Sequence, residues 1–484
     1  MKKLFLQFII IAAAAIALVS CNKLDQQPRS AITSDQFYKT QSDAIAAITA
    51  VYSELTYDAG EQPLYGREIN FLADMTTDDL SAGPSAINPN VRALSSITYT
   101  ATDDRVEVVW RQLYTGIARA NIAIDRIPAI SFDTTQRARL VREAKFLRGL
   151  FYFDLVRFWG DVPLVIHTPS SAANLTSLNV NRSPATAVYA QIIADLTDAQ
   201  NLPASYTGAD LGRATGGAAK TLLAKVYLTQ KDWKDAAEKA NEVITGPYGY
   251  ALFANYADVF NPATKNGKEH IFSSQISSNG GLGNSSSLMA AAFAGFKGNV
   301  PADIPADSGV YKIFSNNDTR KSVTFYTSLI NPATGSSFTF PSFYFGKYVD
   351  RSQLLTPTQS NINFPILRYA DVLLIYAEAT NELSGPTADA YSAINQVRSR
   401  AQIASLPLTL SQSDFRDSLY TERRREFVQE AQRWFDLART GRLVQQVQKV
   451  ATKTNVSATN NLFPIPASEI STNPGLTQNP GYAQ

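Results

Sequence analysis

One segment of the chain, residues 135–159, is apolar on two separate helical faces. The first face carries Leu140, Ala144, Leu147, Phe151, Leu155 and Phe158, and the second carries Phe146, Leu150 and Phe153. A surface helix needs one apolar stripe, so a helix with two must be covered by neighbours on most of its sides. Gly160 and Pro163 end the segment. The segment therefore predicts a helical protein built around one deeply buried helix, and 484 residues provide enough chain to enclose it.

Helical spacing of apolar residues recurs along most of the remaining chain. It predicts helices over residues 42–55 with Ser42 as N-cap, 106–127, 186–200, 365–383 and 386–401, and one or two helices within 411–448. Residues 218–245 predict a helix pair with alanine and aromatic residues at the spacing of a tetratricopeptide repeat, although Lys231 stands where that repeat usually has glycine. The predicted fold is mainly α, a tetratricopeptide-like α-superhelix.

The texture of the sequence changes between residues 261 and 363. Gly, Ser, Asn and Pro cluster there, and short aromatic runs at 323–326 and 338–345 indicate strands. We expect a long loop-rich insertion with short strands, and loops of this length inside a compact domain are often functional. The sequence predicts three regions after the tether: a helical region 41–260, the insertion 261–363, and a C-terminal region 364–484 whose tail from 462 packs as extended chain.

The N-terminus has the features of an export and anchoring signal. Two lysines precede an apolar run over residues 4–19 that only Gln7 interrupts, and this run is short for a membrane-spanning helix. Ser20 then precedes Cys21, the only cysteine of the chain, as in the cleavage site of bacterial lipoproteins. We expect residues 1–20 to be a lipoprotein signal peptide, Cys21 to carry acyl chains such as palmitate, and residues 21–40 to form a tether. The alternative is a free cysteine after an ordinary signal peptide.

Composition narrows the classes of chemistry that the chain can perform. A single cysteine excludes an intramolecular disulfide and a cysteine-based zinc site, and His167 and His270 are the only histidines. The formal net charge of +2 gives no electrostatic footprint for nucleic acid. We predict no catalytic residue, no metal and no cofactor. A glycosidase needs only two carboxylates, so a surface glycosidase stays open as an alternative, as does a protein-binding scaffold.

Two charged motifs allow a functional and a structural interpretation. Arg423-Arg424-Arg425 is flanked by glutamates at helical spacing, and pairs of Glu422 with Arg425 and of Glu430 with Arg433 favour a salt-bridge network over nucleic-acid binding. Asp78-Asp79 has the composition of an acid/base pair or a calcium site, but we favour a role in a turn or a helix cap.

Several stretches, taken together and in order, resemble one family. They are REAKFLR at residues 142–148, GDVPL at 160–164, the helix pair from 218 with Trp233, PILRYADVLL at 365–374, ERRREF at 422–427, RWFDLAR at 433–439, FPIP at 463–466 and QNPGY at 478–482. This set resembles the SusD/RagB family of outer-membrane nutrient-binding lipoproteins. The resemblance spans the chain from the cysteine to the C-terminus.

The resemblance implies a fold, a partner and a role. The fold would be a superhelix of tetratricopeptide-like pairs that carries an irregular ligand-binding portion, here the insertion. The partner would be a SusC-like TonB-dependent channel, and the location would be the outer membrane, facing the cell surface. The role would be capture of a nutrient, an oligosaccharide or polysaccharide in most members and a peptide in others.

Two regions are candidates for ligand contact. The first is the stretch that follows Asp78, with the candidates Asp79, Asn88, Asn90 and Arg92, which lies roughly where family members place such contacts. The second is the insertion, with the candidates Phe296, Tyr311, Tyr326, Tyr344 and also Tyr348. Sugar recognition uses flat aromatic faces with polar groups at their edge. Because all four tryptophans lie in or at the ends of predicted helices, tyrosine and phenylalanine must supply such a platform.

Changing Cys21 to alanine tests the predicted anchor. The acyl chains hold the protein on the membrane by burying methylene groups worth about 0.8 kcal/mol each, so Cys21→Ala should move the protein into the soluble fraction. Membrane fractionation followed by immunoblotting measures this. Full retention of the variant in the membrane fraction would contradict the lipoprotein assignment.

Overall fold

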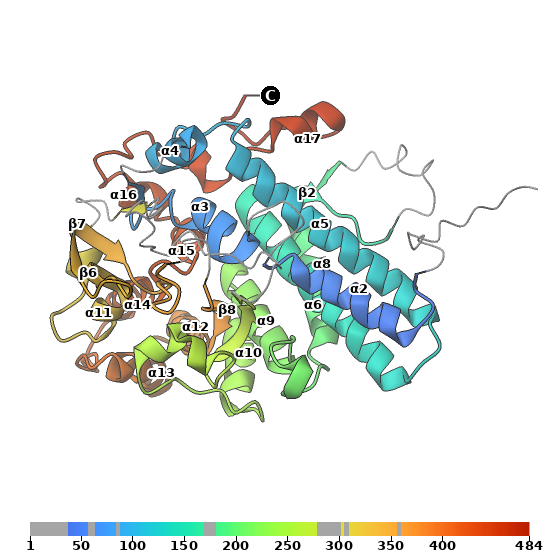
Figure 1. Cartoon of the computed structure of the whole chain (residues 1–484), viewed down its shortest axis with the longest axis horizontal. Coiled ribbons are helices and arrows are strands. Elements are labelled where there is room, and N and C mark those ends of the chain that lie inside the picture. Colours follow the sequence, from blue (N-terminus) through green and yellow to red (C-terminus); the bar gives the residue numbers. More distant parts are fainter. Residues whose placement is uncertain are drawn as a thin grey trace, which may run out of the picture.

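The computed structural model describes residues 37–56, 63–83, 88–168, 181–277, 302–303, 309–355 and 360–483. Cys21, the signal segment and Phe296 lie outside these residues, so the predictions made for them stay predictions. The structure is mainly helical, with long helices packed side by side and the β6–β7 hairpin at the opposite end of the molecule from α2 (Figure 1). None of the described helices has the length and apolarity needed to cross a bilayer.

The helices follow the expected order along the chain. They are α2 (Gln41–Ser53), α3 (Ile69–Ala73), α4 (Pro89–Ser96), α5 (Asp104–Arg126), α6 (Thr134–Trp159), α8 (Ala185–Ala199), α9 (Gly216–Gln230), α10 (Trp233–Thr245), α11 (Arg320–Thr324), α12 (Tyr369–Ser384), α13 (Ala388–Arg400), α14 (Gln412–Phe427), α15 (Arg433–Arg439), α16 (Leu443–Val447) and α17 (Ala467–Thr472). The predicted pair over residues 218–245 is confirmed as α9 and α10, and α12 packs against α10 and α13.

The strands form small antiparallel sheets of two strands each. The pairs are β1 (Ser81–Ala82) with β5 (Ala302–Asp303), β2 (Val162–Pro163) with β3 (Arg182–Ser183), β4 (His270–Ser274) with β8 (Phe364–Arg368), and β6 (Phe325–Ile330) with β7 (Ser337–Phe345). The β4–β8 pair joins the two ends of the predicted insertion. The insertion is therefore closed at its base by backbone hydrogen bonds, and its chain leaves and returns at one place.

Helix α6 is the buried helix that the sequence predicts. From Leu140 onward most of its residues are buried, and it packs between α5 and α8. Gly116 allows the close contact with α5, because a Cβ atom there would lie 2.5 Å from the ring of Phe151. The aromatic end of α6 continues into the C-terminal part of the chain, where Phe158 contacts the rings of Trp434 and Phe463.

Four details of the predicted elements are wrong. The N-cap of α2 is Thr40 rather than Ser42, and the tail contains the short helix α17. The helix predicted from residue 365 begins at Tyr369, because residues 364–368 form β8; a short apolar run buried on both faces cannot be assigned by periodicity alone. The region 411–448 holds three helices, because Gln429 and Ala431 adopt left-handed backbone angles after α14.

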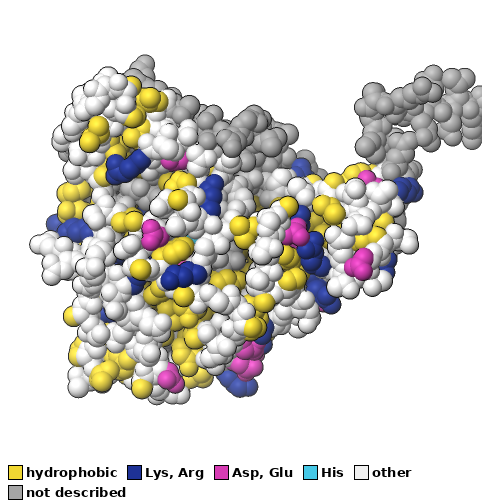
Figure 2. Space-filling view, turned by 60° about the horizontal axis from the view of Figure 1, so that its bottom comes forward, with side chains coloured by type: hydrophobic (Ala, Val, Ile, Leu, Met, Phe, Trp, Pro, Cys, Tyr) yellow, Lys and Arg dark blue, Asp and Glu magenta, His cyan; other side chains and the backbone are white. Residues whose placement is uncertain are grey.

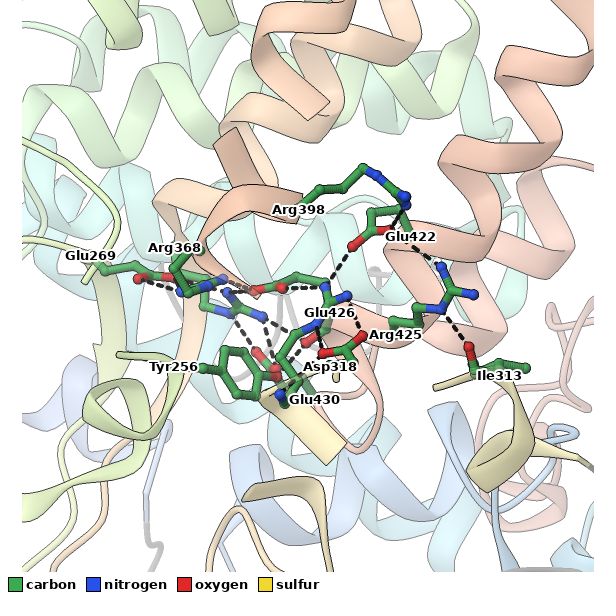
Figure 3. A network of polar contacts seen from close by, with 12 residues as sticks. Tyr256, Glu269, Ile313, Asp318, Arg368, Arg398, Glu422, Arg425, Glu426 and Glu430 are labelled. Atoms are coloured by element: carbon green, nitrogen blue, oxygen red, sulfur yellow. Dashed lines mark hydrogen bonds and ion pairs between the residues drawn. The ribbon is translucent and has the colours of Figure 1, made fainter. Parts of the chain in front are cut away.

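A network of buried ion pairs ties the insertion to the C-terminal helices (Figure 3). Its acidic members are Glu269, Asp318, Glu422, Glu426 and Glu430, and its basic members are Arg320, Lys347, Arg368, Arg398, Arg400 and Arg425. Arg320, from the insertion, is fully buried and contacts Glu422 at 2.6 Å and Glu426 at 2.9 Å on α14. The six positive and five negative charges nearly cancel, as burial of this many charges requires.

The salt-bridge interpretation of the three consecutive arginines is confirmed in one pair and wrong in another. Arg425 lies 3.5 Å from Glu422, as predicted. Glu430 does not pair with Arg433, because α14 ends at Phe427 and the helical spacing is lost; Glu430 contacts Lys347 and Arg368 instead.

Replacing Lys231 with glycine should stabilise the protein. Lys231 ends α9 with φ of 62°, and the backbone N–H of Asp232 donates to the carbonyl of Tyr227 in a Schellman-type cap. A left-handed residue with a Cβ atom costs about 1–2 kcal/mol, so Lys231→Gly should raise the free energy of unfolding by about 1 kcal/mol. Urea unfolding measures this, with Lys231→Ala as the control that removes the charge and keeps the strain. Equal stability of the two variants would contradict the explanation.

Candidate functional site

The segment before β1 is fixed by ion pairs that its two aspartates make with distant arginines. Asp78 contacts Arg433 at 2.8 Å and Arg424 at 3.0 Å, and Asp79 contacts Arg424 at 2.6 Å. Both aspartates are buried. The aspartates lie in a bend and are structural, as favoured, but they act by anchoring this segment to the region of α14 and α15 and not by capping a helix. Asp79 is therefore a buried residue that holds the segment in place through Arg424.

The charge state of Asp78 follows from two opposing effects. Burial raises the pKa of its carboxyl group, but the attraction of Arg433 and Arg424 outweighs burial and lowers the pKa to about 2. Lys453 fixes the same segment by a second route, since its buried ammonium group donates to the carbonyl oxygens of Met75 and Thr77, each at 2.6 Å. Sequence reasoning missed Lys453, because nothing local to it indicates a partner more than 370 residues away.

Helix α4 carries the three polar candidates of the first region. The side chain of Asn88 caps α4 by accepting from the backbone N–H groups of Asn90 at 2.8 Å and Val91 at 3.2 Å. The amides of Asn88 and Asn90 also hydrogen-bond to the carboxyl group of Asp104. The pKa of this group is lowered mainly by its hydrogen bond from Arg105 and further by the two amides. Both asparagines are half-buried, whereas Arg92 is exposed on α4. The asparagines thus hold α4 against the start of α5 and keep part of their surface open to solvent.

The structure brings the two predicted regions together. Helix α4 packs against β1, and the backbone N–H of Ala82 donates to the hydroxyl of Ser95 at 2.8 Å. Strand β1 pairs with β5 of the insertion, and β5 contacts β7 of the hairpin. Elements far apart in sequence are therefore neighbours in space, and we call the region formed by α4, β1, β5 and the β6–β7 hairpin the α4–hairpin surface.

The two faces of the β6–β7 hairpin pack against different neighbours. Phe325 and Phe345 are paired across the strands and buried, and Phe325 packs edge-on against Phe314. Because successive residues of a strand point to opposite faces, the next cross-strand pair, Tyr326 with Tyr344, lies on the other face. There Tyr326 packs against the small buried cluster of Leu329, Val349 and Leu354, and its hydroxyl group is buried. The two tyrosine rings are half-buried, with centroids 6.0 Å apart. They are the aromatic pair of the α4–hairpin surface.

Tyr311 and Tyr348 occupy packing positions instead. The ring of Phe343 stacks on Tyr311 with 3.9 Å between centroids, and the ammonium group of Lys321 lies 4.3 Å from the Tyr311 centroid. Since the phenyl ring covers one face, the ammonium group must cover the other, which leaves no face of Tyr311 for a ligand. Tyr348 is fully buried, stacked on Phe364.

The tryptophans and histidines lie away from this surface or within the core. Trp110, Trp159 and Trp434 are buried and Trp233 is half-buried against the core, so the core assignment of the tryptophans is confirmed. His167 is exposed beside Asp125, at 2.9 Å. Among the described residues, no three His, Cys, Asp or Glu side chains are grouped so that they could hold a metal ion.

Surface charge gives no sign of a polyanionic partner on the face that Figure 2 shows. Lysine and arginine side chains alternate there with aspartate and glutamate, and uncharged surface separates them. A nucleic-acid interface would gather positive charge on one face. A dense cluster of charged residues lies inside the protein instead, in the network of Figure 3.

Two family models match the chain. Residues 261–482 match the model described as "SusD family", and residues 24–228 match the model described as "Starch-binding associating with outer membrane". Together the two matches cover most of the chain. The chain belongs to the SusD/RagB family.

Relatives within the SusD/RagB family cover the chain almost completely. "SusD-like protein P2" of Formosa agariphila is 29% identical over 523 residues, covering 100% of both chains. "Starch-binding protein SusD" of Bacteroides thetaiotaomicron is 25% identical over 503 residues, covering 88% of this chain and 87% of its own. The solved structure named "Laminarin binding SusD-like protein" is 26% identical, with a TM-score of 0.76, and covers 92% of this chain and 100% of its own. The family assignment from sequence motifs is confirmed.

Replacing Asp78 with asparagine tests the anchoring of this SusD/RagB surface. Loss of one partner leaves the buried guanidinium groups of Arg424 and Arg433 undercompensated, so Asp78→Asn should cost about 3–5 kcal/mol at pH 7. Because the folded pKa of Asp78 lies below its unfolded value, its contribution is present above about pH 4 and is lost as the pH falls toward 2. The difference between variant and wild type should therefore shrink at low pH.

Chemical denaturation at pH 7 and pH 3 measures both effects. The matched control is Asp417→Asn, which removes an exposed aspartate paired with Arg442 and should cost less than about 1 kcal/mol. A loss for Asp78→Asn no larger than that of the control would show that Asp78 does not anchor the segment.

Proposed function

We propose that this protein is a non-catalytic, lipid-anchored binding protein of the outer membrane that faces the cell surface. It captures an oligosaccharide or polysaccharide and delivers it to a SusC-like TonB-dependent transporter. Family membership supports the role, and the words "starch-binding" and "laminarin binding" in the names of relatives support the ligand class. The lipobox-like sequence at Cys21 supports the anchor.

The observation that carries the proposal is the cross-strand pair of half-buried rings, Tyr326 and Tyr344, on the α4–hairpin surface, where Tyr326 is fixed by packing against the Leu329 cluster. An aromatic face packs against the apolar C–H side of a pyranose ring, while amides and guanidinium groups bind hydroxyls at the ring edge. Asn90 and Arg92 on α4 supply such polar groups across β1 and β5. Ligand contact through Asn88 and Phe296 belongs to the same proposal, whereas Asp79 supports the surface from below.

Delivery to a partner favours binding by stacking and neutral hydrogen bonds. Such contacts are each worth about 0.5–1.5 kcal/mol, so a site that uses a few of them releases its ligand readily. No reaction is needed for this role, which agrees with relatives that are named for binding.

Removing one ring of the tyrosine pair tests the proposed site. Tyr344→Ala should weaken glycan binding about tenfold, or ~1.4 kcal/mol, because the stacking surface is halved. Isothermal titration calorimetry with starch and laminarin oligosaccharides measures this, and a peptide mixture and an assay for released reducing ends run alongside. The matched control is Tyr227→Ala, which removes a half-buried tyrosine from α9.

Each outcome separates one part of the proposal. Unchanged affinity in Tyr344→Ala with intact folding would move the site away from the hairpin. Binding of peptides in place of glycans would keep the fold and change the nutrient. Release of reducing ends by the wild-type protein would overturn the non-catalytic role.

A further inference from the structure

A second concave surface lies at the other end of α4 from the capping asparagine. It is an open cavity of about 670 Å³ between residues 97–102, which link α4 to α5, and the C-terminal segment from Asn455 to Ala483. The backbone N–H of Ala467 donates to the carbonyl of Ala101 at 2.8 Å, which joins the two walls. Figure 1 shows α4, α17 and the C-terminus close together on this side of the molecule.

The base of the cavity is an ordered chain of hydroxyl and amide groups. The hydroxyl of Tyr482 donates to the carbonyl of Leu462 at 2.9 Å, since a carbonyl can only accept. The hydroxyl of Tyr99, 3.4 Å from that of Tyr482, then donates to it, and the amide of Asn460 donates to Tyr99 at 3.1 Å. Tyr99 is also stacked on Phe463. The ring of Tyr482, which is half-exposed, is therefore held in one orientation at the cavity wall.

The remaining lining is polar and uncharged. Hydroxyl and amide side chains at the rim are Thr100, Thr102, Asn455, Ser457 and Ser471, all exposed. Every described residue that lines the cavity is uncharged. A charged ligand would lose hydration here without gaining an ion pair, whereas a ligand with many neutral hydroxyls would exchange water for equivalent hydrogen bonds. A fixed aromatic ring beside such groups suits a pyranose ring.

We infer that this cavity is an additional subsite for a neutral saccharide, distinct from the α4–hairpin surface. It rests on the proposed function, because it extends glycan capture to the far end of α4. A chain bound at the hairpin surface would gain a second contact through this subsite, which increases avidity without raising the affinity of either site alone. The subsite selects uncharged sugars, because it offers uronate or sulfate groups no partner.

The test compares two neighbouring exposed positions on α17. Ser471 lines the cavity and Thr472 does not, so Ser471→Trp should obstruct the cavity while Thr472→Trp leaves it open. The mature chain, residues 21–484, is labelled with fluorotyrosine, and the ¹⁹F resonances of Tyr482, Tyr326 and Tyr344 are assigned with Tyr→Phe variants. The probes are maltohexaose and laminarihexaose, with hexagalacturonate as the charged comparison.

The expected result is a saturable shift of the Tyr482 resonance with a neutral hexasaccharide. Ser471→Trp should weaken that titration at least tenfold, Thr472→Trp should leave it unchanged, and hexagalacturonate should bind at least tenfold more weakly. Equally strong binding of hexagalacturonate would overturn the selectivity.

The resonances separate this inference from the proposed function. Shifts at Tyr326 and Tyr344 with none at Tyr482 would overturn the subsite and support the hairpin site. A shift at Tyr482 alone would support the subsite and contradict the hairpin site. No shift at any of the three tyrosines with either neutral probe would overturn both sites. An equal response of Tyr482 in Ser471→Trp and Thr472→Trp would overturn the subsite alone.

Discussion

The ion pairs that the carboxylate of Glu426 makes with three arginines are the interaction on which the rest of the architecture depends. Glu426 is fully buried on α14 and contacts Arg320 from the insertion, Arg368 at the end of β8 and Arg400 at the end of α13. Burial raises the pKa of Glu426, but the three arginines outweigh it and hold the pKa well below the usual carboxyl range. Glu426 therefore stays ionised. A buried charge of this kind is tolerated only where its partners are in place, so the network forms only when all three elements have docked.

This requirement extends from Glu426 to the α4–hairpin surface. Neighbouring side chains of α14 reach in different directions: Arg423 contacts Asp371 on α12 at 2.9 Å, and Arg424 contacts Asp78 and Asp79 before β1. Lys347, directly after the hairpin, is buried against Glu430, although burial lowers its pKa to about 8. The hairpin and β1 are thus attached to the same short stretch of α14 and its continuation. The two parts of the α4–hairpin surface keep their relative positions through buried charge rather than through a shared sheet of any size.

Local patterns in the sequence predict the long helices well, because their information is local. The stripes of α5 and α6 give ends within two residues of Asp104–Arg126 and Thr134–Trp159. They fail at β8, since pairing with β4 across about 90 residues decides its conformation. The sequence does carry one signal for the network. Arg368 interrupts an apolar run, and Glu422, Glu426 and Glu430 recur every fourth residue around the three consecutive arginines. Charges at such positions indicate burial with partners, but the partner of Asp78, 355 residues away, has no local signature.

The distribution of charge inside and outside the protein bears on how it binds. Buried ion pairs such as Arg320 with Asp318 and Arg368 with Glu426 fix the frame from within, whereas the two proposed ligand surfaces carry tyrosine, asparagine, threonine and serine side chains, with Arg92 as an exposed cation. Neutral groups of this kind bind sugars through many weak contacts, so affinity grows with the number of sugar units engaged and not with any single residue. In the proposed role, a long glycan is retained while it spans both ends of α4 and is released stepwise as one end is drawn away. A rigid frame with weak, uncharged contacts therefore suits the proposed role, in which the protein holds a ligand and then releases it.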